Sequence, residues 1–390
     1  MVDGQGCTVQ GNGSGTGIDL SNRNNVTIKN TTIKKFYYGI YLSSSSNNTF
    51  SGNDITNNTG PGIFGSWGGI GLFGSSDNNS ISGNKITAYD GYGIWLDYYS
   101  DYNSISGNNI ANNGNGIHLD HSSDNTLSGN NVTANNGYGI RLYYSSDNAL
   151  SGNNIAYNGY GIRLDSSSDN IFCHNNFVAN TQQVNSASSA NVWDDGYPSG
   201  GNYWSDYDGT DLLNGTYRNE TGSDGIGDAE YAIDGNNTDH YPLMAPISFF
   251  DAGTWNDTTY YVNIVSNSTV SHFYFNPDEG AFARFWVKGE TETETFGFCR
   301  VAIPKDLLWV EDGWTVLYGS YSLSYKAFSD ENYTYLYFTY TNPSQNGFTT
   351  VMINGTHVIP EFPPFLILPL FMIVTLLAVI VYKRKKANRG

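Results

Sequence analysis

The feature that most constrains this fold is a motif repeated between residues 17 and 177. Each unit holds Gly-Ile-x-Leu, then Asp-Asn-x-Leu, then Ser-Gly-Asn-Asn-Ile, or close variants of these. Successive opening glycines are 22 to 24 residues apart, except for one longer step with an insertion near residues 57–68, and they are Gly17, Gly39, Gly69, Gly93, Gly116, Gly139 and Gly161. A fixed period of this length indicates a solenoid.

The pattern inside each unit indicates which kind of solenoid forms. Apolar residues do not recur at i, i+3, i+4 and i+7, so helical repeats are excluded. Three short apolar segments, separated by Ser, Asn, Asp and Gly, predict three strands and three turns per unit, which is a parallel β-helix. Because one coil cannot bury its apolar side alone, we expect the isoleucines of successive coils to stack inside it, as at Ile94, Ile117, Ile140 and Ile162.

Asparagine recurs at two positions of the repeat. One set is Asn25, Asn48, Asn79, Asn103, Asn125, Asn148 and Asn170, and the other is Asn30, Asn53, Asn84, Asn108, Asn130, Asn153 and Asn175. We expect each set to fill one corner of the coils, where Asn tolerates the left-handed conformation and its amide bonds coil to coil. Glycine before the second set would supply the positive φ of the bend. Ligand-binding amides are the alternative interpretation.

The amino-acid sequences of the three elements resemble the right-handed parallel β-helix repeats of the NosD-like family, in particular those of its archaeal cell-surface type. Residues 200–207, 224–228 and 239–244 are similar to the tail that follows such helices, so the resemblance covers about residues 1–246. It implies the fold rather than an activity. Founding relatives are associated with copper-enzyme maturation. The sequence offers no Met, Cys or His cluster for copper, so that role is not carried over.

The predicted fold class is all-β: a right-handed parallel β-helix, a small β-sandwich and one C-terminal transmembrane helix. Aromatic and β-branched runs after residue 247 predict the sandwich. The expected parts are a β-helix of about eight coils at 1–184, a NosD-like tail closing it at 185–246, the sandwich at 247–358, a Pro-rich approach with the transmembrane helix at 359–382, and a basic tail at 383–390.

We expect more chain upstream of Met1, because the first coil begins at once with neither a cap nor an apolar leader. That expectation includes a signal peptide and further coils. The alternative is a chain inserted by its C-terminal segment alone.

The C-terminal segment predicts attachment to a membrane. Residues 362–382 form an uncharged run of 21 residues, about 31 Å long as a helix, and four basic residues follow directly. The positive-inside bias then predicts a cytoplasmic tail and an extracellular ectodomain. Residues 359–363, Ile-Pro-Glu-Phe-Pro, resemble the PEF-type sorting signals of archaea, which implies cleavage and a lipid anchor. A permanent single-pass helix is the alternative.

Charge excludes nucleic acid as a partner. The formal net charge is −18, and five of the 18 basic residues lie within the last eight positions. Phosphate backbones require basic patches, which the rest of the chain lacks. Sequons before the apolar segment favour an exported glycoprotein, at Asn214, Asn219, Asn236, Asn256, Asn267, Asn332 and Asn354.

The Gly-Ile-x-Leu elements predict a candidate binding face. With Ile and Leu pointing inward, the residue between them and the residue after Leu point outward, which aligns Trp95, Asp97, His118, Asp120, Arg141, Tyr143, Arg163 and Asp165. Such a mixed aromatic and polar strip favours glycan binding, with a purely structural surface role close behind.

A polysaccharide hydrolase or lyase is the alternative function. Asp97 and Asp120 would lie one coil apart, about 5 Å, the carboxylate separation of retaining glycosidases. Any two acids on adjacent coils share that spacing, so the scaffold alone explains it. The sequence therefore makes an enzyme the weaker hypothesis.

Calcium is the one cofactor that the sequence suggests. Asp206, Asp208, Asp224 and Asp228 lie on Gly-punctuated loops, and Ca²⁺ takes several oxygen ligands. No Asp-x-Asp-x-Asp-Gly loop ending in Glu is present, and turn formation explains most of these aspartates. These four aspartates are weak candidates for calcium ligands, and the sequence predicts no other metal site.

Overall fold

The computed structural model describes residues 1–58, 68–87, 91–289, 295–342 and 347–359. Within them the regular structure consists of β-strands and one short 3₁₀ helix, η1 (Pro277–Glu279). No helix in the described ranges is long and apolar enough to span a bilayer. The predicted transmembrane segment, the basic tail and most of the insertion after residue 57 lie outside them.

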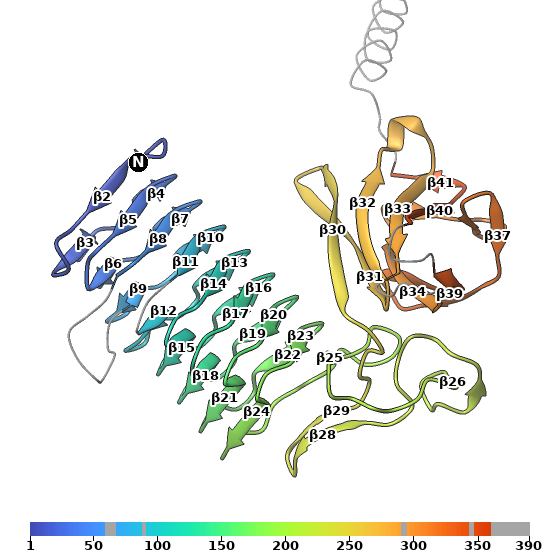
Figure 1. The fold of residues 1–390 in the computed structure, drawn as a ribbon, viewed down its shortest axis with the longest axis horizontal. Coiled ribbons are helices and arrows are strands. Elements are labelled where there is room, and N and C mark those ends of the chain that lie inside the picture. The colour runs from blue at the N-terminus through green and yellow to red at the C-terminus, as the bar shows by residue number, and fades with distance from the viewer. Residues whose placement is uncertain (59–67, 88–90, 290–294, 343–346, 360–390) are drawn as a thin grey trace, which may run out of the picture.

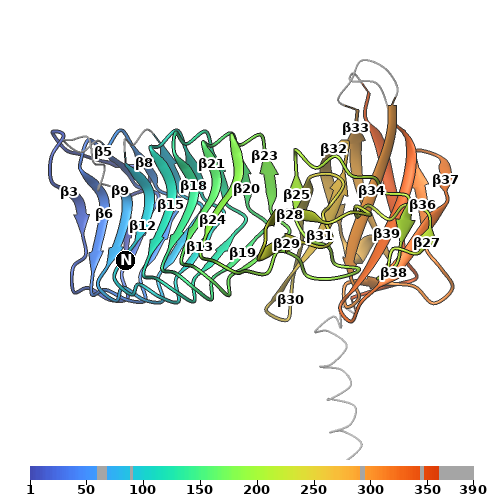
Figure 2. The same ribbon diagram turned by 90° about the horizontal axis from the view of Figure 1, so that it is seen from below.

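The N-terminal half winds into a parallel β-helix with three faces (Figures 1 and 2). Among the described residues, sheet A contains β1 (Val2–Asp3), β4 (Thr27–Lys29), β7 (Thr49–Ser51), β10 (Ser80–Ser82), β13 (Ser104–Ser106), β16 (Thr126–Ser128), β19 (Ala149–Ser151) and β22 (Ile171–Cys173). Sheet B contains β2 (Thr8–Gln10), β5 (Thr32–Lys34), β8 (Asp54–Thr56), β11 (Lys85–Thr87), β14 (Asn109–Ala111), β17 (Asn131–Thr133), β20 (Asn154–Ala156), β23 (Asn176–Val178) and β25 (Tyr203–Trp204). Sheet C, toward which Figure 2 looks, contains β3 (Thr16–Asp19), β6 (Tyr38–Ser43), β9 (Gly68–Phe73), β12 (Tyr92–Leu96), β15 (Asn115–Asp120), β18 (Tyr138–Tyr143), β21 (Tyr160–Asp165) and β24 (Gln182–Ala187).

In sheet C, the strand register places isoleucine over isoleucine and leucine over leucine on successive coils. Ile94 pairs with Ile117, Ile117 with Ile140, and Ile140 with Ile162, all in parallel. Their side chains are 0% exposed, so the predicted inward stack is confirmed. The opening glycine is required by space: a Cβ on Gly116 would lie 2.3 Å from the carbonyl oxygen of Gly139 on the next coil.

Buried asparagine amides bond coil to coil, as predicted. The Asn84 amide donates to Asn108 Oδ1 at 3.0 Å, and the Asn108 amide donates to Asn130 Oδ1 at 3.0 Å. In the other column, Asn79 donates to Asn103 at 3.1 Å. Each amide thereby satisfies a backbone or side-chain partner that the corner would otherwise leave unpaired.

The predicted positive φ of the glycine before the second asparagine set is confirmed, for example at Gly107 with φ +61°. The left-handed conformation expected of the asparagines was wrong, because the ladder asparagines after these glycines do not adopt it. Asn25 and Asn30 occupy the position before the ladder asparagine, with φ of 60° and 51°, because the first units are offset by one residue. A third ladder, missed in the sequence, runs through Asn113, Asn135, Asn158 and Asn180.

Aromatic residues cover the C-terminal end of the β-helix. The Trp193 ring stacks on Phe172 with centroids 4.2 Å apart, and Trp204 stacks on Phe177 at the same distance. The rest of this region holds β26 (Leu213–Asn214), β27 (Glu220–Thr221), β28 (Tyr231–Asp234) and β29 (Asn237–Asp239). The last strand of sheet C, β24, runs across the predicted boundary at residue 184.

The remaining described strands form two antiparallel sheets around a common apolar core. One holds β30 (Ile247–Trp255), β31 (Thr258–Ser266), β34 (Thr295–Pro304), β39 (Tyr333–Asn342) and β38 (Tyr325–Ser329). The other holds β32 (Thr269–Phe275), β33 (Phe282–Lys288), β40 (Thr349–Asn354), β36 (Thr315–Tyr318) and β37 (Tyr321–Leu323), and a short pair is formed by β35 (Leu308–Trp309) and β41 (His357–Val358).

Candidate functional site

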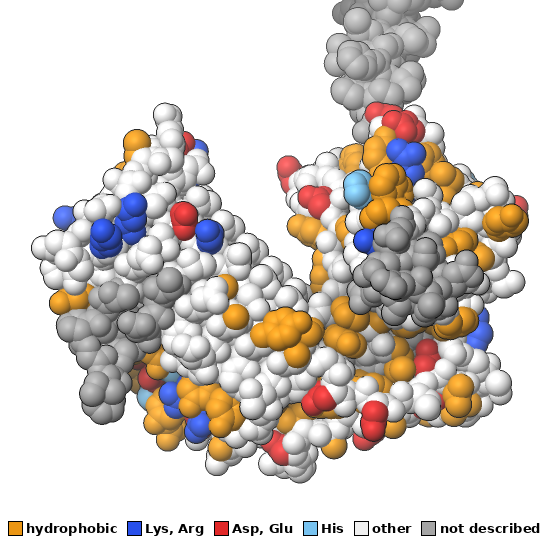
Figure 3. All heavy atoms as spheres, viewed as in Figure 1, with side chains coloured by type: hydrophobic (Ala, Val, Ile, Leu, Met, Phe, Trp, Pro, Cys, Tyr) orange, Lys and Arg blue, Asp and Glu red, His pale blue; other side chains and the backbone are white. Residues whose placement is uncertain are grey.

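The eight predicted site residues share the outer face of sheet C, and we call them the outer strip. Trp95 pairs with His118, His118 with Arg141, and Arg141 with Arg163 on four neighbouring strands. The adjacent column runs from Asp120 to Tyr143 and Asp165, with Asp97 one coil before. In Figure 3, hydrophobic and basic side chains gather at the lower left, over β15, β18 and β21.

The strip is less exposed than its outward direction implies. His118 is 3% exposed and Asp97 is 7% exposed. The cover over His118 is the Tyr92 ring, which stacks on the imidazole with centroids 4.8 Å apart and planes inclined by 16°. Trp95 packs between Tyr92 and Phe73, at 5.3 and 5.0 Å. Neighbouring aromatic rings therefore bury the centre of the strip.

Both guanidiniums of the strip are held by one carboxylate. Arg163 donates to Asp165 from Nε at 2.8 Å and from Nη2 at 2.9 Å, and Arg141 Nη2 donates to the same group at 3.0 Å. The hydrogen bonds from Arg163 are the main cause that lowers the pKa of Asp165. The Tyr138 ring lies 5.6 Å from one guanidinium and 5.5 Å from the other, within cation–π range.

The two aspartates of adjacent coils have pKa values shifted in opposite directions. Burial, and then the charge of Asp120, raises the pKa of Asp97 to about 6. Burial acts on Asp120 too, but the imidazoles of His118 and His121 outweigh it and lower the pKa of Asp120. His121 Nδ1 lies 2.6 Å from Asp120, and His118 Nε2 lies 3.7 Å away. Burial also lowers the pKa of His118, which keeps its ring neutral at pH 7.

Two buried polar atoms of the strip lack a hydrogen-bond partner. Within the part of the chain that the structure describes, nothing bonds to His118 Nδ1 or to Trp95 Nε1. Such atoms are rare in folded proteins, because leaving a buried donor or acceptor unpaired costs about 1–3 kcal/mol. Both atoms lie at the centre of the outer strip.

The structure adds aromatic residues that the sequence analysis missed. Tyr138 and Tyr160 pair on the row before the opening glycine, and Tyr92 lies on the same row. At the corner after sheet C, the His121 ring stacks on Tyr144 at 5.0 Å and lies 6.4 Å from Tyr99. The repeated Tyr-Gly-Ile and the Tyr-Tyr pairs were visible signals, but the prediction considered only two outward positions per coil.

The calcium candidates bond mainly to their own surroundings. Asp228 accepts the backbone N–H groups of Leu212 and Leu213, at 2.8 and 3.1 Å. Asp224 is buried and accepts the Ile226 N–H, and Asp206 accepts the Tyr231 hydroxyl. In the described ranges, no three of these carboxylates are grouped to hold a metal ion. The four therefore occupy separate positions in the loops between β25 and β28.

Founding members of the family that the repeats resemble are associated with copper, a metal that takes Met, Cys and His ligands. In the described ranges, no three His, Cys, Asp or Glu side chains are grouped to hold a metal ion. Cys7 is exposed, Cys173 is half-buried, and Cys299 is buried beside Ser266 and Tyr340. The described residues therefore do not fit a copper site.

Solved structures similar to this chain include two polysaccharide epimerases. The periplasmic alginate epimerase AlgG is 27% identical over 40% of this chain and 36% of its own, with a TM-score of 0.37. The A-module of Azotobacter vinelandii mannuronan C-5 epimerase AlgE6 is 15% identical over 47% of this chain and 56% of its own, with a TM-score of 0.40. This chain thus spans about a third of the AlgG chain. Comparison with curated proteins finds no match.

A family model identifies the repeats directly. The model described as periplasmic copper-binding protein (NosD) matches residues 2–131 and 73–209, which together make up more than half of the chain. The same residues form the stacked coils and the strand that follows them. The chain belongs to the NosD family, and its N-terminal half is a parallel β-helix of that family.

Proposed function

We propose that this chain is an extracellular surface protein that binds a neutral glycan along the outer strip. The observation that carries the proposal is a continuous row of rings beside hydrogen-bonding groups. Tyr41, Phe73 and Trp95 follow one another with centroids 5.2 and 5.0 Å apart, and the Arg and Asp groups continue the row. A sugar ring has an apolar face that packs on aromatic rings and hydroxyls that bond to polar neighbours.

The charges of the strip favour a neutral glycan over a polyuronate. Arg141 and Arg163 both donate to Asp165, so neither guanidinium is free of an acidic partner. Asp97 and Asp120 add negative charge on the same face, and the whole chain carries −18. An acidic polymer would meet repulsion there, whereas hydroxyl groups can donate to the carboxylates.

Affinity electrophoresis through neutral and acidic polysaccharides tests the proposal. We expect retardation in at least one neutral glucan, mannan or galactan gel, and none in polyuronate gels. Trp95→Ala should abolish the retardation, while Tyr321→Ala, which removes a ring 74% exposed on β37, should retain it. Absence of retardation in all gels, or equal retardation of Trp95→Ala, contradicts the proposal.

A polysaccharide hydrolase or lyase is the second candidate, and one observation favours it. Asp97 and Asp120 lie on adjacent coils with pKa values moved apart, as a general acid and an ionised partner require. The expected activity releases reducing ends or an unsaturated uronate product. It should disappear in Asp97→Asn and in Asp120→Asn and persist in Asp124→Asn, an exposed neighbour. An inactive wild type on a broad polysaccharide panel excludes this candidate.

We propose that the chain is attached to the cell membrane. The family's description names a periplasmic protein, and the apolar run at 362–382 with its basic tail supports an ectodomain outside the cell. In this proposal the two antiparallel sheets form a small membrane-proximal β-sandwich. The PEF-like residues 359–363 favour removal of the helix and a lipid anchor, as in archaeal surface proteins. Intact-mass measurement of the membrane-extracted protein separates a processed from a permanent anchor.

Calcium binding to Asp206, Asp208, Asp224 or Asp228 remains a weaker proposal. Isothermal titration with CaCl₂ tests it, and the fourfold variant with Asn at these positions is the comparison. Equal heats of calcium binding for the wild type and the fourfold variant contradict this proposal.

A further inference from the structure

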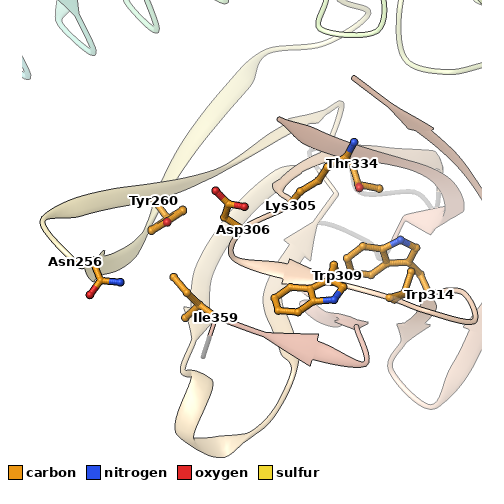
Figure 4. Close-up of a pocket in the computed structure, with 9 residues that line it drawn as sticks. Asn256, Tyr260, Lys305, Asp306, Trp309, Trp314, Thr334 and Ile359 are labelled. Atoms are coloured by element: carbon orange, nitrogen blue, oxygen red, sulfur yellow. The ribbon is translucent and has the colours of Figure 1, made fainter. Parts of the chain in front are cut away.

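A cavity lies in the two-sheet domain, far along the chain from the outer strip. Its volume is about 650 Å³, within the range of small-ligand sites. Residues of separate segments line it: Asn256, Tyr260, Lys305, Asp306, Trp309, Val310, Trp314, Thr334 and Ile359. Figure 4 shows Tyr260 on one side, Trp309 and Trp314 on the other, and Asp306 between them.

The walls of this cavity are aromatic, and their orientation is fixed by packing. The Trp309 indole stacks on His357, with centroids 5.2 Å apart and planes inclined by 9°. Trp314 is 8% exposed and belongs to the core of the domain, and its backbone N–H donates to the Tyr325 hydroxyl at 2.9 Å. The rings are therefore held in place before any ligand arrives, which reduces the entropic cost of binding.

A polar group at the same cavity has hydrogen-bonding capacity left. In the described ranges, no hydrogen bond is formed by the Asp306 carboxylate. Lys305 is different, because its Nζ donates to the Asp330 carbonyl oxygen. The cavity thus combines apolar walls with an available carboxylate.

These features select among ligand classes. The Asp306 carboxylate and the Lys305 ammonium, whose Nζ donates to the neutral Asp330 carbonyl oxygen, offset each other's charge at the cavity, so neither an anion nor a cation is favoured there. A purely apolar ligand would exclude water from Asp306 without replacing its hydrogen bonds. A neutral molecule with one apolar face and a hydroxylated edge satisfies both the rings and the carboxylate. We infer that this cavity is a second binding site, which takes one or two pyranose units of a neutral glycan.

The second site does not depend on the outer strip. Figure 1 places β15, β18 and β21 at the lower left and β41, which carries His357, at the upper right. Two sites for one polymer would raise the overall affinity by linkage, and a single site would still bind an oligosaccharide. The two proposals can therefore fail separately.

The test is a titration of the full chain, expressed without glycosylation, with soluble cellohexaose, mannohexaose and laminarihexaose. Tryptophan fluorescence and calorimetry should show saturable binding of at least one of them in a Trp95→Ala background, which removes the strip. Asp306→Ala should weaken that binding about tenfold, the effect of one lost hydrogen bond to a charged group. Trp309→Ala should abolish it.

Trp286→Ala is the matched control. Trp286 also stacks on a histidine, His272, at 4.2 Å and is 38% exposed, but it does not line the cavity. The affinity of the Trp286→Ala variant for the oligosaccharide should equal that of the Trp95→Ala protein in which it is made. Thermal melting checks that Trp309→Ala is folded. If Trp309→Ala does not fold, the affinity of Asp306→Ala decides the test, because Asp306 is exposed and its substitution leaves the core intact. Absence of saturable binding in the Trp95→Ala background, or unchanged affinity in Asp306→Ala and Trp309→Ala, overturns the inference.

Discussion

At the scale of single residues, the buried asparagines show how a polar side chain stabilises a solenoid. Asn130 donates to Asn153 Oδ1 at 2.9 Å and to the Ile105 carbonyl at 2.8 Å. Its own Oδ1 accepts the backbone and side-chain N–H groups of Asn108, both at 3.0 Å. One side chain thus pairs four groups that the corner would leave buried and unsatisfied.

Asn130→Ala is expected to lower the free energy of unfolding by about 2–4 kcal/mol, because several buried partners lose their bonds at once. Urea unfolding followed by circular dichroism measures it. Asn131→Ala is the control at the next residue, whose side chain is not part of the buried ladder and bonds to Asn109 at 3.2 Å and to Asn154 at 2.7 Å. Equal losses for the two variants contradict the role of the ladder.

Asp97 gives a pH dependence with a definite sign. Its pKa is raised from 3.8 to about 6, so the folded state binds the proton more tightly than the unfolded state. The resulting stabilisation is complete below about pH 3.8 and is lost as the pH rises through about 6. The free energy of unfolding of Asp97→Asn minus that of the wild type should therefore be about 1–2 kcal/mol larger at pH 7 than at pH 4. Urea unfolding at both pH values measures this, and a difference that is the same at both contradicts the assignment.

At the scale of elements, the end of the β-helix needs a cover, because the last coil exposes apolar side chains and unpaired strand edges. Trp204 supplies part of it: its ring packs between Phe177 and Tyr231, each at 4.2 Å. Its indole N–H donates to the buried Asp239 at 2.8 Å. The strand β25 that carries it also continues sheet B.

Trp204→Ala should destabilise the β-helix by about 3–5 kcal/mol through the loss of this packing. Hydrogen exchange should rise first in β22 and β23, the strands beneath the cover. Tyr217→Ala, at a ring 85% exposed in the same region, should change neither quantity. Unchanged exchange in β22 and β23 contradicts a capping role.

At the scale of the whole molecule, specific contacts join the β-helix to the two-sheet domain. Asn176 exchanges two hydrogen bonds with the backbone of Ile247, both at 2.9 Å. Arg300 is 2% exposed, donates to the Pro198 carbonyl, and lies 4.4 Å from the centre of the Tyr335 ring. An apolar cluster that includes Ile226, Leu243 and Phe298 surrounds this contact.

Removing the junction bonds should uncouple the two parts. In Asn176→Ala we expect one calorimetric transition to separate into two, because each part has its own core. Asn154→Ala is the matched control, since Asn154 occupies the same position one coil earlier and contacts Asn131 instead. A single unchanged transition in Asn176→Ala shows that the apolar cluster alone holds the parts together.

The sequence was a sufficient guide to the β-helix because its pattern is local and repeated. The positions of Ile117 and Ile140 within their units decide which face is buried, and the period decides which residues pair. The same argument placed Trp95, His118 and Arg141 side by side. It could not show that Tyr92 covers His118, since that depends on rotamers and on packing between coils.

The sequence by itself determined the solenoid, its inward apolar columns, two of its asparagine ladders and the order of side chains along sheet C, because each follows from one repeating period. Only the tertiary structure decided the burial of Asp97 and His118, the sharing of Asp165 by two arginines and the cavity beside Trp309. These depend on contacts among residues from different coils or strands, whose distances no periodic pattern contains.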